Sequence, residues 1–352
     1  RVGDRLVEQF QDGLEILQLS ADLDHARERR LVSAVAVVLV LVGRLEFLQS
    51  LGVEAIEIGC AGAHDLGYCN PDELLQNAQG LRRWLDTFER HGIEISAFSA
   101  HGAPLSPDPA YAAEESRRFR QACRLAEAAG VSRITLVAGL PEGGPGDRTP
   151  CWAVTPFPAI HQEIRRWQWK ERVLPYWSEH AKIAQEHGVR LCFEPQMSDV
   201  VHNPHELMRL RDELGPVVGC NLAPSHLMYQ GIDVLDAIRY LGNAIYHVHV
   251  KDLRLQTNNL RIKGFLDPTP MHEVPRRSWS FALPGWGNDA QFWRSFVAEL
   301  RLVGYEDVLS IEVEVDDVDM SEGVEKAVAF MKPLVLSKPP GKPWWEHAHI
   351  EM

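Results

Sequence analysis

The chain has 352 residues, of which 45% are hydrophobic and 24% are charged, and these values exclude a disordered or fibrous protein. Its net charge of −13, from 36 Lys and Arg against 49 Asp and Glu, disfavours nucleic acid and anionic membranes as partners. The six cysteines include no Cys-x-x-Cys pair and are too few for a disulfide scaffold, which favours free thiols in a cytoplasmic protein.

The first element that the sequence predicts is a strand within the apolar segment Leu31–Gly43. This segment is rich in β-branched residues, as is typical of a strand buried on both faces. It is shorter than the roughly 20 residues that a membrane-spanning helix needs. It also lacks a convincing small-residue cleavage site, so a secretion signal is disfavoured.

From Gly52 onward, short apolar runs alternate with amphipathic helical stretches. The runs predict strands over Ala55–Gly59, Glu94–Ala100, Arg133–Gly139, Arg190–Pro195, Val217–Leu222, Ala244–Val250 and Val308–Glu314. The stretches predict helices over Pro71–His91, Tyr111–Ala129, Ile160–His187, His205–Leu214, Val234–Leu241, Asp289–Val303 and Gly323–Val335. Several of the helices end at a glycine just before the next strand, as at Gly92 and Gly130.

Strands that alternate with helices favour a parallel sheet, and the early apolar strand brings the number of units to eight. We therefore expect an α/β protein with a (β/α)8 TIM barrel. Length alone suggests two domains of about 150 residues each, but such barrels commonly run from roughly 200 to over 400 residues as one domain. We expect an atypical N-terminal segment over residues 1–30, the barrel over 31–336 and a tail over 337–352.

Two connections are longer than a barrel requires. One spans Leu140–Ala159 after the fourth strand, and the other spans Leu253–Asn288 after the seventh. Both follow strands, so both are expected on the face where barrel active sites form, as covers or lids. Arg277, in the second connection, is a candidate contact for an anionic or polyhydroxylated ligand, with a solvated side chain as the alternative.

Polar residues in otherwise apolar strands indicate the chemistry. Glu194 closes the fifth strand, His249 lies within the seventh and Glu312 lies within the eighth. A buried carboxylate is costly unless it is paired or bound to a metal, and three such side chains converge at one end of a barrel. Oxygen and imidazole ligands without a thiolate suit Mn²⁺, Mg²⁺, Co²⁺ or Zn²⁺, in a site that keeps positions open for substrate.

These motifs resemble the sugar phosphate isomerase/epimerase family of xylose isomerase-like barrels, over roughly Gly52 to Leu336. The residues that carry the resemblance are CFEPQ (Cys192–Gln196), NLAPSHLMYQGID (Asn221–Asp233), HVHVKD (His247–Asp252), LSIEVE (Leu309–Glu314) and SAHGAPLSPDP (Ser99–Pro109).

The resemblance implies metal ligands at Glu194, His249 and Glu312, most favourably for Mn²⁺. It also implies substrate contacts at His226, His101, Lys251 and Asp252. The family's fourth ligand is an Asp followed by Pro-Ser-His, and Ala223 stands at that position here. The loss of one carboxylate predicts weaker metal binding, by at least about 1.4–2.7 kcal/mol.

The expected activity is sugar isomerisation or epimerisation. A metal that chelates a carbonyl and a neighbouring hydroxyl would act as a Lewis acid and stabilise an enediolate, while Glu194 and Glu312 would move the carbon-bound proton. One alternative is a lyase of the same family, either dehydratase-like or the metal-carrying subunit of a C-glycoside deglycosidase. Another is a non-catalytic barrel, because of Ala223. The expected partners are a sugar or glycoside substrate and further subunits, identical or different.

Overall fold

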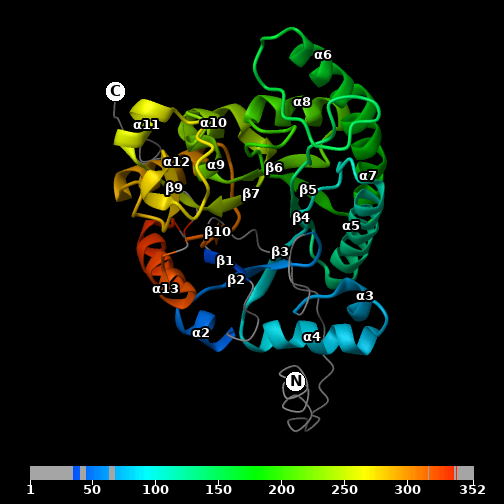
Figure 1. The fold of residues 1–352 in the computed structure, drawn as a ribbon. Helices are drawn as coiled ribbons and strands as arrows, with labels where there is room; N and C mark the ends of the chain where they lie inside the picture. Colours follow the sequence, from blue (N-terminus) through cyan, green and yellow to red (C-terminus); the bar gives the residue numbers. More distant parts are fainter. Residues whose placement is uncertain (1–34, 40–44, 63–67, 316, 337, 339–352) are drawn as a thin grey trace, which may run out of the picture. The chain divides into compact units, whose positions relative to one another are not determined.

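The computed structural model describes residues 35–39, 45–62, 68–315, 317–336 and 338. Its centre is a closed barrel in which the strand order is β1-β10-β7-β6-β5-β4-β3-β2 and all neighbours are parallel (Figure 1). The barrel strands are β1 Val35–Leu39, β2 Ala55–Gly59, β3 Glu94–Ser99, β4 Arg133–Leu136, β5 Arg190–Phe193, β6 Val218–Leu222, β7 Ile245–Val250 and β10 Leu309–Ile311. The predicted (β/α)8 barrel is therefore confirmed.

Closure depends on the strand expected in the early apolar segment. Val35 of β1 pairs with Leu309 of β10, and Ala36 pairs with Ala55 of β2. The strand prediction for this segment is correct within Val35–Leu39. The N-terminal segment 1–30 and most of the tail 337–352, expected as separate regions, lie outside the described residues.

Helices follow the barrel strands and lie outside them (Figure 1). They are α2 Leu45–Ser50, α3 Pro71–Leu74, α4 Ala78–Arg90, α5 Pro109–Ala129, α6 Ile160–Trp167, α7 Leu174–Glu186, α8 Pro204–Leu214, α9 Pro224–Met228, α10 Val234–Leu241, α11 Thr257–Lys263, α12 Ala290–Leu302 and α13 Met320–Met331. In the predicted helix 160–187, a π-helical stretch, Gln168–Val173, joins α6 to α7.

The ends of α5 show how the sequence sets a helix. Asp108 accepts hydrogen bonds from the N–H groups of Ala110 and Tyr111, and Pro109 occupies the first turn. Gly130 ends the helix with a φ of 71°, a left-handed conformation that favours glycine. The chain then turns directly into β4, which places the end of that strand at the mouth of the barrel.

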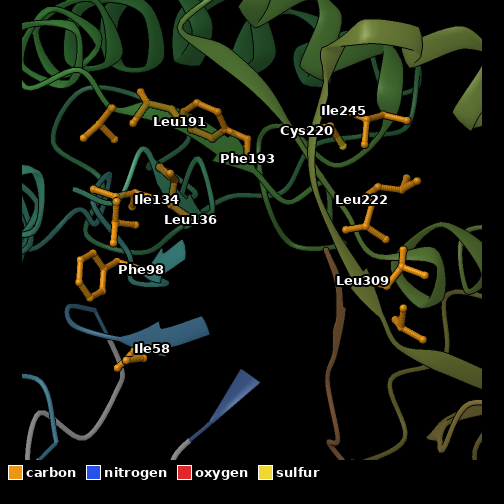
Figure 2. Packing of buried hydrophobic residues seen from close by; sticks show 14 of the residues in the cluster. Ile58, Phe98, Ile134, Leu136, Leu191, Phe193, Cys220, Leu222, Ile245 and Leu309 are labelled. Atoms are coloured by element: carbon orange, nitrogen blue, oxygen red, sulfur yellow. The ribbon is translucent and has the colours of Figure 1, made fainter. Parts of the chain in front are cut away.

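The main core fills the layer between strands and helices. Figure 2 shows apolar side chains of successive strands in this cluster, among them Ile134, Phe193, Leu222 and Leu309, all with no exposed surface. The ring of Trp177 in α7 packs edge-on against Phe193, with 4.7 Å between ring centres. This packing makes the barrel wall rigid and fixes the side chains that point into its interior.

The two long connections follow β4 and β7 as expected, but the second has structure of its own. After β7 the chain forms an antiparallel hairpin of β8 Asp252–Leu255 and β9 Trp279–Ala282, with α11 between the two strands. The sequence predicts a loop here, because Gly, Pro and charged residues interrupt its short apolar runs, and the hairpin differs from that prediction. No helix among the described residues is long and apolar enough to cross a membrane.

Candidate active site at the barrel mouth

Three side chains predicted as metal ligands come together at the C-terminal end of the barrel. Glu194 directly follows β5, His249 is the penultimate residue of β7 and Glu312 directly follows β10. One ligand atom from each lies within 4.8 Å of the other two. Nδ1 of His249 is 2.9 Å from Oε2 of Glu194 and 3.0 Å from Oε2 of Glu312. The arrangement leaves two carboxylates facing one imidazole nitrogen.

Burial makes the charges of this cluster depend on one another. Burial alone would raise the pKa of Glu194, but His226 and the other imidazoles nearby outweigh it and hold this pKa well below its usual range. The same opposition acts at Glu312, where Lys251 and then His249 lower the pKa to about 2. Both glutamates are therefore ionised at neutral pH.

The imidazole of His249 responds in the opposite direction. Burial would lower its pKa, but the surrounding carboxylates, with Glu57 foremost, hold it well above the usual range. Without a metal, the ring therefore carries a proton between the two glutamates. A cation can replace that proton because the carboxylates favour positive charge at this point.

His226, expected to contact substrate, lies against Glu194. Its Nε2 is 2.9 Å from Oε1 of Glu194, and its Nδ1 is 2.7 Å from the hydroxyl of Tyr229. Tyr229 also accepts a hydrogen bond from the N–H of Met197. The Tyr229 hydroxyl thus fixes the orientation of the His226 ring. His101, the other histidine expected here, lies farther out, with Nε2 3.7 Å from Oε2 of Glu194.

Lys251 is held by two carboxylates. Its Nζ is 2.8 Å from Oε1 of Glu312 and 2.6 Å from Oε2 of Glu314, and it lies 4.4 Å from the ring centre of Phe281. Burial would lower the pKa of Lys251, but Glu312 and Glu314 outweigh it and raise this pKa, so the ammonium stays charged. Lys251 and His249 therefore contact different oxygens of Glu312.

The β6 edge of the site contains an amide and a methyl group. Asn221 donates a hydrogen bond to Oε2 of Glu194 over 2.7 Å, whereas its own Oδ1 is buried without a hydrogen-bond partner among the described residues. Ala223, where the family pattern has an Asp, is 2% exposed and precedes the first turn of α9 without a side-chain cap. The corner nearest β6 therefore supplies no carboxylate.

A second group of titratable residues lies deeper in the barrel, and sequence reading missed it. Glu57 of β2 contacts His247 and His249, and the three residues form a further group that could hold a metal ion. The signals were present in the sequence, since Glu57 interrupts an apolar strand as Glu194 does. His247 precedes His249 by two residues and so shares its face of β7.

Two of the expected substrate contacts are engaged elsewhere in the protein. Oδ2 of Asp252 accepts the N–H groups of Gly285, Gly287 and Asn288, and Oδ1 accepts the N–H of Leu253 and the Asn288 amide. Both oxygens of Asp252 are thus occupied, and the geometry favours a role in fixing the loop after β9 over a substrate contact.

Arg277 is buried, not solvated, because its guanidinium stacks 4.2 Å from the ring centre of Trp279 and donates to the Trp279 and Thr269 carbonyls. It lines a cavity of about 360 Å³ beside the site. The walls of this cavity include Arg254, Arg277, Phe281, Val313, Glu314 and Met320. Phe281 and Glu314 also contact Lys251, so the cavity adjoins the carboxylate cluster.

The comparison with protein families agrees with this geometry. The model of the family described as "Xylose isomerase-like TIM barrel" matches residues 45–334. An uncharacterized protein of Bacillus subtilis (strain 168), YfiH, is 33% identical over 292 residues, which cover 82% of this chain and 93% of that protein. An inosose dehydratase of Clostridium perfringens is 30% identical over 144 residues, which cover 38% of this chain and 43% of the enzyme.

Solved structures share the fold at low sequence identity. IolI protein with a bound zinc atom superposes with a TM-score of 0.59 at 17% identity, covering 86% of this chain and 98% of that one. D-psicose 3-epimerase of Clostridium cellulolyticum H10 gives a TM-score of 0.57 at 14% identity, covering 87% of this chain and 100% of that one. Barrels of this architecture therefore include a zinc-binding protein, an epimerase and, by sequence, a dehydratase.

Proposed function

Because the chain belongs to the xylose isomerase-like TIM barrel family, we propose that it is a metal-dependent enzyme that removes a proton from the carbon next to a sugar carbonyl and returns it as an epimerase or isomerase. The observation that carries this proposal is the approach of Glu194 and Glu312 to the same nitrogen of His249, at 2.9 and 3.0 Å. Two ionised carboxylates at one cation position provide both a metal site and a pair of proton acceptors.

The residues fit a divalent metal. Glu194, His249 and Glu312 would hold it, with Mn²⁺ expected and Mg²⁺, Co²⁺ or Zn²⁺ as alternatives. The fit is supported by the mutual distances of the three ligand atoms. It is also supported by Oε2 of Glu312, which is buried without a hydrogen-bond donor among the described residues and faces Nδ1 of His249. When bound, the metal would polarise the substrate carbonyl as a Lewis acid.

The chain's own residues would handle the proton. Glu194 follows β5, Glu312 follows β10, and both are ionised, so either can accept a carbon-bound proton. Lys251 contacts Oε1 of Glu312, so Oε2, which faces His249, is the oxygen that would accept the proton. His226, oriented by the Tyr229 hydroxyl, would hydrogen-bond a substrate oxygen beside Glu194.

A dehydratase outcome is the second candidate, in which the proton is removed in the same way but a hydroxyl on the neighbouring carbon leaves. The similarity to inosose dehydratase favours it. The cavity of about 360 Å³ next to Lys251 also favours a substrate larger than a free monosaccharide, such as the glycoside of a lyase reaction. A sugar or glycoside partner is part of the proposal, and assembly into oligomers stays a prediction.

Exchange of substrate hydrogen for deuterium tests the proposal. The protein is incubated in D₂O with Mn²⁺ and a panel of ketoses, inososes and 3-keto glycosides, and the products are read by NMR. We expect label on the carbon next to the carbonyl. Inversion of configuration at the labelled carbon indicates an epimerase. Transfer of the carbonyl group to the neighbouring carbon indicates an isomerase, and loss of water indicates a dehydratase.

Two variants and a control connect the exchange to the site. Glu194→Gln and Glu312→Gln should each lower the exchange rate by about 10²–10⁴-fold, because the amide accepts no proton. Glu314→Gln is the matched control, since Glu314 also binds Lys251 but its side chain is 56% exposed. Absence of exchange on every substrate, or equal loss in all three variants, would contradict the proposal.

A further inference from the structure

Glu57 is a fully buried carboxylate with four donors around it, of which Ser310 is the most distant, with its Oγ 3.4 Å from Oε2. Its Oε2 lies 2.8 Å from Nε2 of His247 and 2.8 Å from Nε2 of His249, and its Oε1 accepts the hydroxyl of Thr135 over 2.6 Å. An ionised carboxylate only accepts hydrogen bonds, and a buried one is stable only when donors surround it. Both Nε2 atoms must therefore carry protons toward Glu57.

The consequence for His249 is a fixed orientation of the ring. With its Nε2–H directed at Glu57, only Nδ1 remains to face Glu194 and Glu312. We propose that Glu57 is a positioning residue, which holds His249 in the Nε2–H form so that the lone pair of Nδ1 is presented to a metal between the two glutamates. This inference rests on the metal site of the proposed function.

The inner group does not need an ion of its own. Glu57, His247 and His249 could hold a metal by the proximity of their atoms, but such a metal would require the lone pairs of both Nε2 atoms. The two distances of 2.8 Å to one oxygen match hydrogen bonds, and the hydroxyls of Thr135 and Ser310 complete the set of donors around the carboxylate. Hydrogen bonding alone thus accounts for every polar atom of the Glu57 carboxylate.

The position of Glu57 explains why a residue from β2 affects a site formed by β5, β7 and β10. The second nitrogen of a metal-bound histidine usually donates to a carboxylate or carbonyl, which fixes the ring and makes the ligand more basic. Here the pairing crosses the barrel interior between β2 and β7, which are separated by β1 and β10, and it joins residues 192 positions apart in sequence. The ring of His249 and the Glu57 carboxylate are both buried, so bulk water does not compete for this hydrogen bond.

Zinc affinity of Glu57 variants tests the proposal without any sugar substrate. Glu57→Leu removes the acceptor, and we expect its Zn²⁺ affinity to fall by about 10–100-fold. Glu57→Gln can keep a carbonyl oxygen toward the histidines without the charge, so its loss should be smaller. Thr135→Val is the matched control, because it removes the donor to Oε1 and leaves the oxygen that faces His249 unchanged. Denaturation of the metal-free variants separates folding defects from binding defects.

The protonated nitrogen is read directly by NMR of ¹⁵N-histidine-labelled, zinc-loaded protein, with His249 identified by its loss in a His249→Asn variant. We expect a slowly exchanging proton on Nε2 and a zinc-bound Nδ1, and faster exchange of that proton in Glu57→Gln. This measurement compares the wild type with Glu57→Gln, so it tests the proposal even if Glu57→Leu does not fold.

Zinc bound through Nε2 of His249, or wild-type affinity and an unchanged Nε2 proton in the Glu57 variants, would overturn this inference and leave the proposed metal site intact. A wild-type protein that takes up neither Zn²⁺ nor Mn²⁺ would overturn both this inference and the proposed function.

Discussion

Lys251 and Glu312 form a buried ion pair at the barrel mouth, with Nζ 2.8 Å from Oε1, while the other oxygen of Glu312 faces His249. One carboxylate is thereby shared between a permanent cation and the candidate metal position. This sharing holds Glu312 ionised and limits the directions in which its side chain can turn, because each oxygen has its own cationic neighbour.

Removal of the Lys251 ammonium should destabilise the metal-free protein. Lys251→Met leaves Glu312 and Glu314 without their cation, and breaking such a buried pair typically costs about 3–5 kcal/mol. Urea denaturation at neutral pH measures the free energy of unfolding. Lys170→Met is the control, because Lys170 pairs with Glu171 on the surface with its side chain 83% exposed, and it should leave stability unchanged. Equal changes in the free energy of unfolding would show that the buried pair of Lys251 contributes no more stability than the surface pair of Lys170.

Asp199 should make stability depend on pH. It lies in the loop after β5 and accepts the N–H groups of Gly139 and Val201, yet burial raises its pKa to about 8. The folded state then binds a proton that the unfolded state has released. The stability that this group contributes is present below pH about 4 and is lost as the pH rises toward about 8, at up to about 1.4 kcal/mol per unit.

An Asp199→Asn variant isolates this contribution. The free energy of unfolding of both proteins is measured by denaturation between pH 5 and 8. We expect the variant to become more stable relative to the wild type as the pH rises. The asparagine keeps one acceptor for the backbone N–H groups of the two loops and carries no charge. A difference that stays constant over this range would show that Asp199 remains ionised throughout.

Ala223→Asp should strengthen metal binding. The added carboxylate would stand directly after β6, at the position where the family pattern has its fourth ligand, and we expect an increase in affinity of at least about tenfold. Titration calorimetry with Mn²⁺ measures it, and Ala223→Asn, similar in shape but neutral, is the control. Both residues can also cap α9, so a gain in stability common to the two variants reports the cap alone. If neither variant changes the affinity, position 223 does not face the metal.

Tyr229→Phe should impair the reaction more than it impairs folding. The substitution removes the hydroxyl that contacts Nδ1 of His226 at 2.7 Å, and loss of such an orienting bond typically costs about 10–100-fold in activity. The deuterium-exchange rate measures it. Tyr246→Phe, in which the lost hydroxyl donates to the Pro216 carbonyl at the other end of β7, should exchange at the wild-type rate. A larger loss of exchange rate in Tyr246→Phe than in Tyr229→Phe would argue against a role for His226.

The fold could be predicted because its signals are local. Each strand and helix is encoded by the spacing of apolar residues, and each turn by residues such as Asp108, Pro109 and Gly130, so the eight units could be counted along the chain. The carboxylates at Glu194 and Glu312 were visible for a similar reason, since a charge at the end of a buried strand requires compensation.

The pairing within the site could not be predicted, because it joins residues far apart in sequence. The residues next to Glu57 and Asp252 in the sequence do not reveal their partners. Glu57 contacts His249, whereas Asp252 holds the loop after β9. Both are acidic residues that are fully buried in the folded protein. Barrel closure decides between them, because it brings Glu57 of β2 within hydrogen-bond distance of β7 across the interior, whereas Asp252 begins the β8–β9 hairpin outside the barrel sheet.

The order of residues along the chain is therefore enough to show which of them face the interior, since hydrophobic periodicity depends only on neighbours along the chain. Which oxygen faces which nitrogen, and hence which imidazole nitrogen is left for a metal, depends on the folded barrel. A hydrogen bond is made over about 3 Å and in one direction, and only the closed barrel sets atoms 192 residues apart to that accuracy.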